Sequence, residues 1–200
     1  MLPLIYTNAT AASVFVLACL VWLIPEWSGM FRQMSKVSRR DAMVHDRGSL
    51  VILLGLQWIG LALNFLLAGL WREAAILWQA EAVFVLGVML IPVGVAFRWY
   101  AIRTLGEYFT RDVAVSAGQQ VVGHGPYRLI RHPAYSGTFV TMLGVGLATT
   151  NWASLISLLT CIFAGHFYRV RVEEQALVRT LGQPYVEYMQ HTKRFIPLVF

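Results

Sequence analysis

The chain has 200 residues, of which 58% are hydrophobic and only 13% are charged, and its formal net charge is +6. A soluble domain carries about 25% charged residues, so this composition excludes an ordinary soluble enzyme and indicates one membrane-embedded domain. The two cysteines, Cys19 and Cys161, lie in separate apolar runs, which argues against a disulfide framework. The cationic residues lie beside apolar runs, where contact with lipids explains them better than binding of nucleic acid.

Apolar segments recur along the chain at lengths that suit a bilayer. A spanning helix needs about 20 residues, because about 30 Å of hydrocarbon is crossed at about 1.5 Å per residue. We expect the first span to end near Pro25, with Trp22 and Trp27 as interfacial anchors. The full set of expected segments is 10–27, 49–70 and 74–97, followed by two shorter arms at 134–150 and 153–168.

The two short arms are expected to form a helical hairpin that turns at Asn151. A separate polar helix at 170–181 should follow them and end at Gly182, because glycine commonly closes a helix. The predicted fold class is therefore all-α: a polytopic integral membrane protein with about five transmembrane helices.

The distribution of Lys and Arg predicts the orientation of the chain. Fifteen of these residues lie in the regions 26–48, 98–133 and 169–194, whereas the turn at 71–73 holds only Arg72. With five spans, the three cationic regions share one side of the membrane, and an excess of Lys and Arg marks the cytoplasmic side. We therefore expect an external N-terminus and a cytoplasmic C-terminus.

The stretch GHGPYRLIRHPAYSG at 123–137 cannot be a spanning helix. Each of its prolines removes a backbone donor and disfavours helical geometry in the preceding residue. We expect this loop to form half of a binding site, with 169–174 as the other half. Arg169 and Glu173 are four residues apart, so they share one face of a helix. The histidines are dispersed, without an HExxH or CxxC pattern, so no metal site is expected.

Three motifs resemble the isoprenylcysteine carboxyl methyltransferase family, within a wider group that includes phospholipid methyltransferases of similar membrane architecture. They are RHPAYSG at 131–137, RVRVEE at 169–174 and LGQPYVEY at 181–188, and the resemblance covers about 106–197. It implies a single membrane methyltransferase domain, with an N-terminal helical pair at 1–73 and a catalytic core at 74–200. It also implies a cytoplasmic pocket for S-adenosylmethionine, built from the 106–135 loop and the C-terminal helix, with S-adenosylhomocysteine as the product.

The resemblance also assigns roles to individual residues. Arg169 would bind the substrate carboxylate, and Glu173 would lie near the cofactor; these two form the expected catalytic pair. The remaining cofactor-binding positions would be Gln119, Gln120, Val121, Val122, Tyr127, His132, Pro133, Ala134 and Tyr135. Gln119 and Gln120 depart from the His-Thr that eukaryotic members often have, which leaves a backbone role for this segment.

The implied reaction is methyl transfer to the C-terminal carboxylate of an isoprenylated cysteine, or a similar lipophilic carboxylate, that enters from the bilayer. A carboxylate is ionised at neutral pH, so its methylation needs no general base. An alternative is N-methylation of a phospholipid amine, which would need a base such as His132 or Glu174. A membrane reductase that uses NADPH and a non-enzymatic membrane protein are further alternatives. The sequence leaves the natural acceptor and the oligomeric state open.

Overall fold

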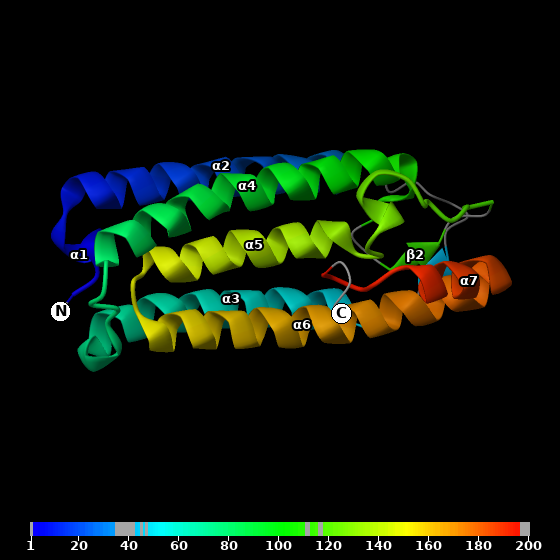
Figure 1. The fold of residues 1–200 in the computed structure, drawn as a ribbon. Helices are drawn as coiled ribbons and strands as arrows, with labels where there is room; N and C mark the ends of the chain where they lie inside the picture. The colour runs from blue at the N-terminus through cyan, green and yellow to red at the C-terminus, as the bar shows by residue number, and fades with distance from the viewer. Residues whose placement is uncertain are drawn as a thin grey trace.

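The computed structural model describes residues 2–34, 43–44, 46, 48–110, 113–115 and 118–196. Its long helices run side by side along one axis (Figure 1). The α-helices are α1 Leu4–Thr7, α2 Ala9–Met34, α3 Ser49–Leu70, α4 Ala80–Leu105, α5 Pro133–Ala148, α6 Trp152–Leu181 and α7 Gln183–His191. The short elements are the 3₁₀ helices η1 Arg72–Ala74, η2 Gly106–Tyr108 and η3 Gly125–Arg128, and the antiparallel strands β1 Met43–Val44 and β2 Ala114–Val115. The all-α prediction is confirmed.

The bundle has the apolar outer surface of a membrane protein. Within the described residues, four helices are long and apolar enough to cross a membrane: α2, α3, α4 and α6. Large apolar side chains on their outer faces are exposed, including Val16, Val51, Trp58, Leu66 and Ile156. α5 has 16 residues and is shorter than these helices. The number of spans therefore stays a prediction, with α5 as the expected fifth.

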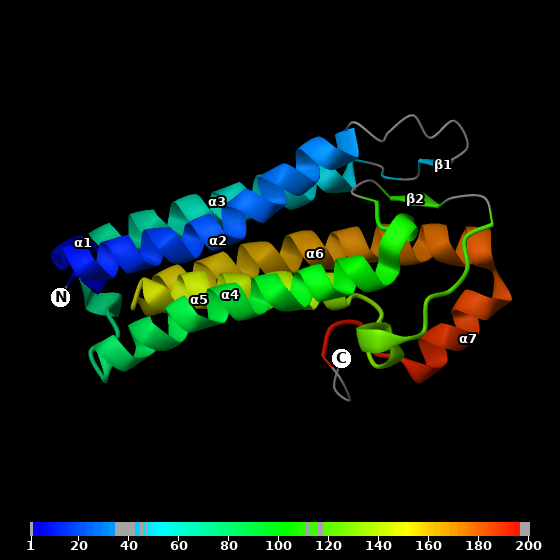
Figure 2. The same cartoon turned by 90° about the horizontal axis from the view of Figure 1, so that it is seen from above.

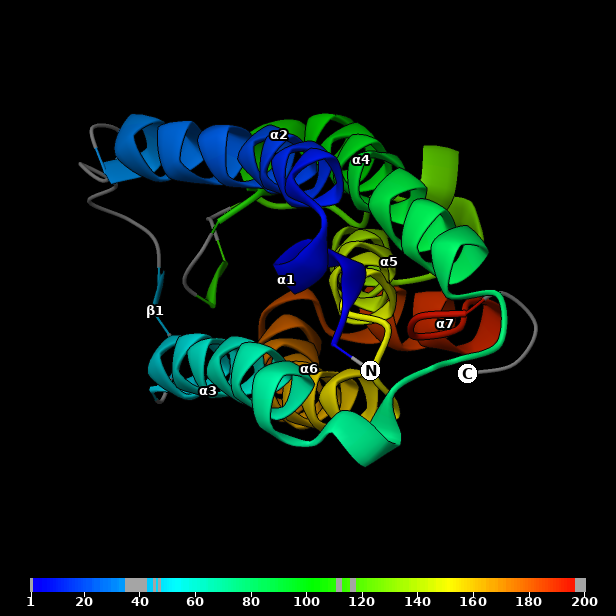
Figure 3. The same cartoon turned by 90° about the vertical axis from the view of Figure 1, so that its left-hand side faces the viewer.

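α5 lies in the centre of the bundle, between α2 and α4 on one side and α3 and α6 on the other (Figure 3). Glycines allow α4 and α5 to touch through their backbones. A Cβ built on Gly94 would lie 2.4 Å from the Thr141 hydroxyl oxygen, and one on Gly144 would lie 2.6 Å from the Gly87 carbonyl oxygen. This close approach fixes the position of the first turn of α5, which carries the RHPAYSG motif.

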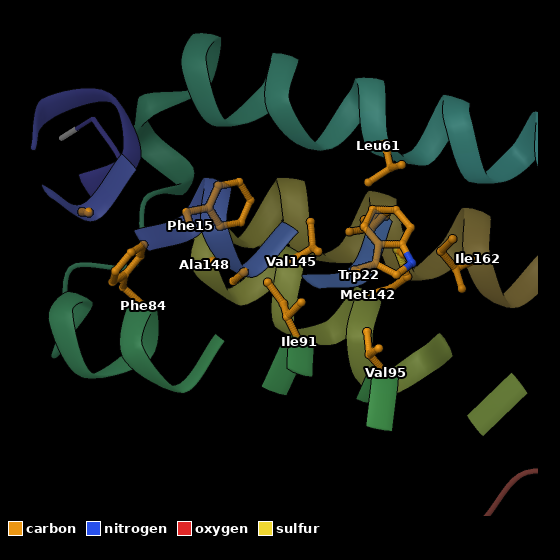
Figure 4. Packing of buried hydrophobic residues seen from close by; sticks show 13 residues of the cluster. Phe15, Trp22, Leu61, Phe84, Ile91, Val95, Met142, Val145, Ala148 and Ile162 are labelled. Atoms are coloured by element: carbon orange, nitrogen blue, oxygen red, sulfur yellow. The ribbon is translucent and has the colours of Figure 1, made fainter. Parts of the chain in front are cut away.

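The apolar core gathers around this central helix. Ile91 of α4 and Met142 of α5 are fully buried there, and Phe15 and Trp22 of α2 pack into the same cluster (Figure 4). The prediction that Trp22 is an interfacial anchor is therefore wrong. Trp22 is only 8% exposed and packs in the buried core cluster that also contains Leu61 and Met142. The side chain of Trp27 lies outside the described residues.

The predicted hairpin of the last two apolar arms is confirmed. Residues 149–151 join α5 to α6. The side chain of Asn151 caps α6 by accepting a hydrogen bond from the Ser154 amide, 3.1 Å away. The Asn151 side chain also donates to the Trp71 carbonyl oxygen at 2.8 Å. This asparagine therefore joins the hairpin turn to the end of α3.

Several predicted helix boundaries are wrong. α2 continues through Pro25 to Met34, as membrane helices can when neighbouring groups satisfy the freed carbonyl. α4 begins at Ala80 instead of residue 74, because the preceding segment pairs with the hairpin turn through the Ile76 amide and the Thr150 carbonyl oxygen. The separate helix expected at 170–181 is the end of α6, which runs unbroken for 30 residues. The span at 49–70 and the stop at Gly182 are confirmed.

The alternating directions of the long helices bring three regions to one end of the bundle. The C-terminal ends of α2, α4 and α6 lie at the end that carries β2 and α7, and the N-terminus lies at the other end (Figures 1 and 2). These helix ends belong to the three regions that the charge pattern groups together. The side of the membrane that this end faces stays a prediction.

The glycine contact between α4 and α5 gives a test of the packing. We expect Gly94→Ala to lower the free energy of unfolding by about 1–3 kcal/mol, because the new methyl group must displace packed backbone. Gly55→Ala is the matched control, since a Cβ at Gly55 meets no atom within 4 Å. Thermal unfolding in detergent measures both variants. Equal midpoints for the two would contradict the close packing.

Candidate active site

A pocket opens at the end of the bundle where the three regions meet. Its lining includes Gln119, Gln120, Val121, Val122, Tyr127, His132, Ala134, Tyr135, Arg169 and Glu173. Every predicted site residue except Pro133 therefore lines this one pocket. Pro133 is fully buried as the first residue of α5. Proline suits that position because its missing N–H would have no partner within the helix. Pro133 therefore shapes the start of α5.

The chain before α5 is held in place by the C-terminal segment. The amide of Arg131 donates to the Lys193 carbonyl oxygen at 2.7 Å, and the amide of His132 donates to the Arg194 carbonyl oxygen at 3.1 Å. The Ser136 hydroxyl donates to the Phe195 carbonyl oxygen at 2.6 Å. The isolated parallel bridge between Ile130 and Lys193 consists of the bond from the Arg131 amide and a second bond, from the Lys193 amide to the Leu129 carbonyl oxygen at 3.1 Å. A segment near residue 193 thus fixes the backbone of the RHPAYSG motif.

The hydroxyl group of Tyr135 joins the two predicted catalytic residues. It donates to Glu173 Oε2 at 2.8 Å and accepts from Arg169 Nε at 3.5 Å. The imidazole of His132 stacks on the Tyr135 ring, with centroids 5.7 Å apart, and its Nδ1 lies 4.0 Å from Glu173 Oε2. Arg169 and Glu173 therefore meet through a residue of α5 on the face of α6 that the sequence predicts.

The guanidinium group of Arg169 is held from the opposite side by residues that the sequence analysis missed. Arg169 is only 2% exposed, and its Nη1 donates to Asp46 Oδ1 and to the Ser49 hydroxyl oxygen, the latter at 2.8 Å. Burial acts to raise the pKa of Asp46, but hydrogen bonds from Leu50 and Ser49 and the charge of Arg169 outweigh it, so the pKa falls below its usual value. The sequence does place Asp46 shortly before the start of α3, and an acidic residue near a helix start is a common capping pattern. That pattern was the available signal for Asp46.

Glu174 lies on a different face of α6 and has a different set of partners. Its carboxylate accepts from Arg131 Nε at 2.9 Å and from Arg194 Nη2 at 2.8 Å, and it lies 3.4 Å from His132 Nε2. Arg131 also donates to the Met189 and Thr192 carbonyl oxygens. Glu174 therefore anchors the C-terminal segment beneath the pocket.

Two tyrosines of α7 complete the pocket wall. Tyr185 is 4% exposed, and the Tyr188 hydroxyl donates to the Tyr127 carbonyl oxygen at 2.7 Å. Burial raises the pKa of Tyr188 to about 12. The sequence analysis used these tyrosines only as part of a family motif. Their spacing of three residues on a helix was the signal that they share one face.

The lining suits an amphipathic ligand that carries positive charge. Glu173 offers a carboxylate, and Tyr127 and Tyr185 offer aromatic faces, which attract cations. Arg169 presents a buried cation beside them, so a carboxylate can be bound next to a cationic ligand. Across the described part of the chain, no group of three or more His, Cys, Asp and Glu side chains is placed to hold a metal ion.

The neighbouring glutamates should respond differently to loss of charge. We expect Glu174→Gln to lower the free energy of unfolding by about 3 kcal/mol, because it leaves partly buried arginines without their counter-ion. Glu173→Gln is the matched control and should unfold close to the wild type, since the Glu173 side chain is 29% exposed. Thermal unfolding and tryptic cleavage near Lys193 measure the effect. A Glu174→Gln variant as stable and as protease-resistant as the control would contradict the anchoring role.

Comparison with known proteins shows which family this chain resembles. Residues 85–179 match the family described as "Isoprenylcysteine carboxyl methyltransferase (ICMT) family". The chain is 30% identical over 115 residues to "Protein-S-isoprenylcysteine O-methyltransferase A" of Arabidopsis thaliana, which covers 56% of this chain and 58% of that relative. It is 31% identical over 117 residues to "Protein-S-isoprenylcysteine O-methyltransferase" of Saccharomyces cerevisiae, which covers 58% of this chain and 49% of that relative. The chain thus spans about half the length of the curated relatives it matches.

A solved structure of a eukaryotic intramembrane Ras methyltransferase shares the fold. The TM-score is 0.63 at 22% sequence identity, and the match covers 98% of this chain and 70% of that chain. This likeness establishes the polytopic membrane fold. The predicted resemblance is confirmed: residues 85–179 match the family model, and the curated relatives that this chain resembles are named as isoprenylcysteine methyltransferases.

Proposed function

We propose that this chain is a membrane enzyme that transfers a methyl group from S-adenosylmethionine to the carboxylate of an isoprenylated cysteine or a similar lipophilic carboxylate. The observation that carries the proposal is the arrangement at Tyr135, whose hydroxyl joins Glu173 and Arg169 within one pocket. The names of the curated relatives support the same reaction, since they are protein-S-isoprenylcysteine O-methyltransferases.

The charge and the residue types of the pocket lining support S-adenosylmethionine as its ligand. That cofactor, when bound, supplies a methyl group activated by a positively charged sulfonium. Glu173 would pair with the cofactor's amino group, and Tyr127 would offer an aromatic face to its positive charge. The backbone of residues 119–122 would run along the cofactor, because all four of these residues line the pocket.

Arg169 would bind the acceptor carboxylate. A charge-assisted hydrogen bond from the guanidinium would orient the attacking oxygen. Methyl transfer then depends on bringing the oxygen and the methyl group into line in a site shielded from water. No general base is needed for an ionised carboxylate. An amine acceptor would need one, and of the two candidates, His132 and Glu174, Glu174 is already paired with Arg131 and Arg194.

An apolar groove supports a lipophilic acceptor. It lies between α5 and α6, and its lining includes Phe97, Phe139, Leu143 and Phe163. Phe139 contacts His166, which in turn contacts the ring of Tyr135, with centroids 5.0 Å and 5.1 Å apart. The lipid chain of the acceptor would enter from the bilayer along this groove. From the charge pattern, we propose that the pocket faces the cytoplasm.

The proposal is tested by methyl transfer to defined acceptors. Purified protein receives S-adenosylmethionine with a labelled methyl group and either an S-farnesylated cysteine or phosphatidylethanolamine. We expect label in the cysteine derivative that is released by base, as a methyl ester requires. Arg169→Lys keeps the positive charge but removes the planar guanidinium group. We expect this change to cost about 1.5–3 kcal/mol of binding free energy and to lower kcat/KM for this acceptor roughly 10- to 100-fold.

Glu73→Gln is the control for this experiment. Glu73 is exposed in η1, at the end of the bundle opposite the pocket, so this change should leave transfer unaltered. Base-stable label on the phospholipid amine would replace the carboxylate proposal with N-methylation. Absence of transfer to both acceptors would contradict the proposed function.

A further inference from the structure

We propose that Asp46 is a positioning residue for Arg169. It holds the guanidinium group of Arg169 in one orientation before the acceptor carboxylate arrives. The inference rests on the proposed function of Arg169. Asp46 precedes residues 85–179, which match the family model, so the resemblance assigns it no role. Its own contacts carry the argument.

Asp46 supplies the negative charge that a buried guanidinium requires. Arg169 is 2% exposed, and its Nη1 donates both to Asp46 Oδ1 and to Ser49 Oγ. A buried charge is costly unless it is paired and hydrogen-bonded. Asp46 thus allows Arg169 to keep its charge and a fixed place within the protein before any acceptor binds.

Asp46 is anchored by the start of α3, independently of Arg169. The Ser49 amide donates to the Asp46 carbonyl oxygen at 2.8 Å, and the Leu50 amide donates to Asp46 Oδ2 at 3.2 Å. The Ser49 hydroxyl donates to Asp46 Oδ1 at 2.9 Å. The N-terminus of a helix also stabilises a nearby negative charge. The Asp46 carboxylate therefore has a fixed position, and it holds the longer side chain of Arg169 in place.

Two sides of the guanidinium are defined by different helices. Nη1 is directed to Asp46 and Ser49 at the start of α3, and Nε is directed to the Tyr135 hydroxyl at the start of α5. A planar group that is held at two of its nitrogens cannot rotate in its plane. Such preorganisation lowers the entropy cost of binding a carboxylate and improves the alignment of its oxygen.

The test compares Asp46→Asn, Asp46→Glu and the control Glu73→Gln, with an S-farnesylated cysteine as acceptor. For Asp46→Asn we expect KM for the acceptor to rise roughly 10-fold or more, because a weakened charge-assisted bond is worth about 1.4 kcal/mol or more. The affinity for S-adenosylhomocysteine, measured by titration calorimetry, should stay within about twofold, because Glu173 retains its contacts. Asp46→Glu should recover part of the loss, since it keeps the charge.

The cofactor titration separates a positioning role from a folding defect. Asp46→Asn protein that binds S-adenosylhomocysteine normally is folded around the pocket, so its acceptor KM is interpretable. Ser49→Ala offers a milder variant, which removes one hydroxyl from the same cluster and should raise KM in the same direction by a smaller factor. A variant that loses both cofactor affinity and transfer in proportion would overturn positioning in favour of a purely structural role.

Two further outcomes contradict the inference. An unchanged KM in Asp46→Asn would show that Arg169 is oriented without this partner. A lower KM would show that Asp46 competes with the acceptor for the guanidinium. Both of these leave the proposed function standing, because the wild type still transfers methyl to the carboxylate. If the wild type transfers no methyl to this acceptor, the proposed function fails first, and the role of Asp46 fails with it.

Discussion

The buried charge of Arg169 is the constraint around which the pocket is organised. A guanidinium that is 2% exposed must find its partners inside the protein. Asp46 and Ser49 reach it from the start of α3, and Tyr135 reaches it from the start of α5. These helix ends can meet there because α5 lies between α4 and α6 and begins at the same end of the bundle as α3 (Figure 3). Helix packing and site electrostatics are therefore coupled.

Two consecutive glutamates illustrate how the same residue type serves different purposes. Successive residues on a helix point about 100° apart, so Glu173 enters the pocket while Glu174 turns away from it. Glu173 accepts from the Tyr135 hydroxyl and remains 29% exposed to the pocket. Glu174 is 6% exposed and pairs with Arg131 and Arg194. One carboxylate is thus left for a ligand, and the other holds the C-terminal segment under the RHPAYSG motif.

Local patterns made much of the fold and about half of the site predictable. The span at 49–70 was predictable from a long segment in which only Ser49, Gln57 and Asn64 are polar. The pocket residues followed from the family resemblance, together with the helical spacing of Arg169 and Glu173. The end of α2 and the continuity of α6 were missed, because Pro25 and the change from apolar to polar residues near Arg169 both favour a helix end in the sequence. Asp46 lies 123 residues from Arg169 in sequence. No local pattern identifies such a pair, since it depends on how α3 packs along α6.

Glu173 lines the pocket that we propose binds S-adenosylmethionine. Calorimetric titration of the purified protein with S-adenosylhomocysteine tests this binding directly, because no acceptor is required. We expect saturable one-to-one binding, weakened roughly 10-fold by Glu173→Gln, since loss of one charge-assisted hydrogen bond is worth about 1.4 kcal/mol or more. No binding to the wild type, or equal binding to Glu173→Gln, would contradict it.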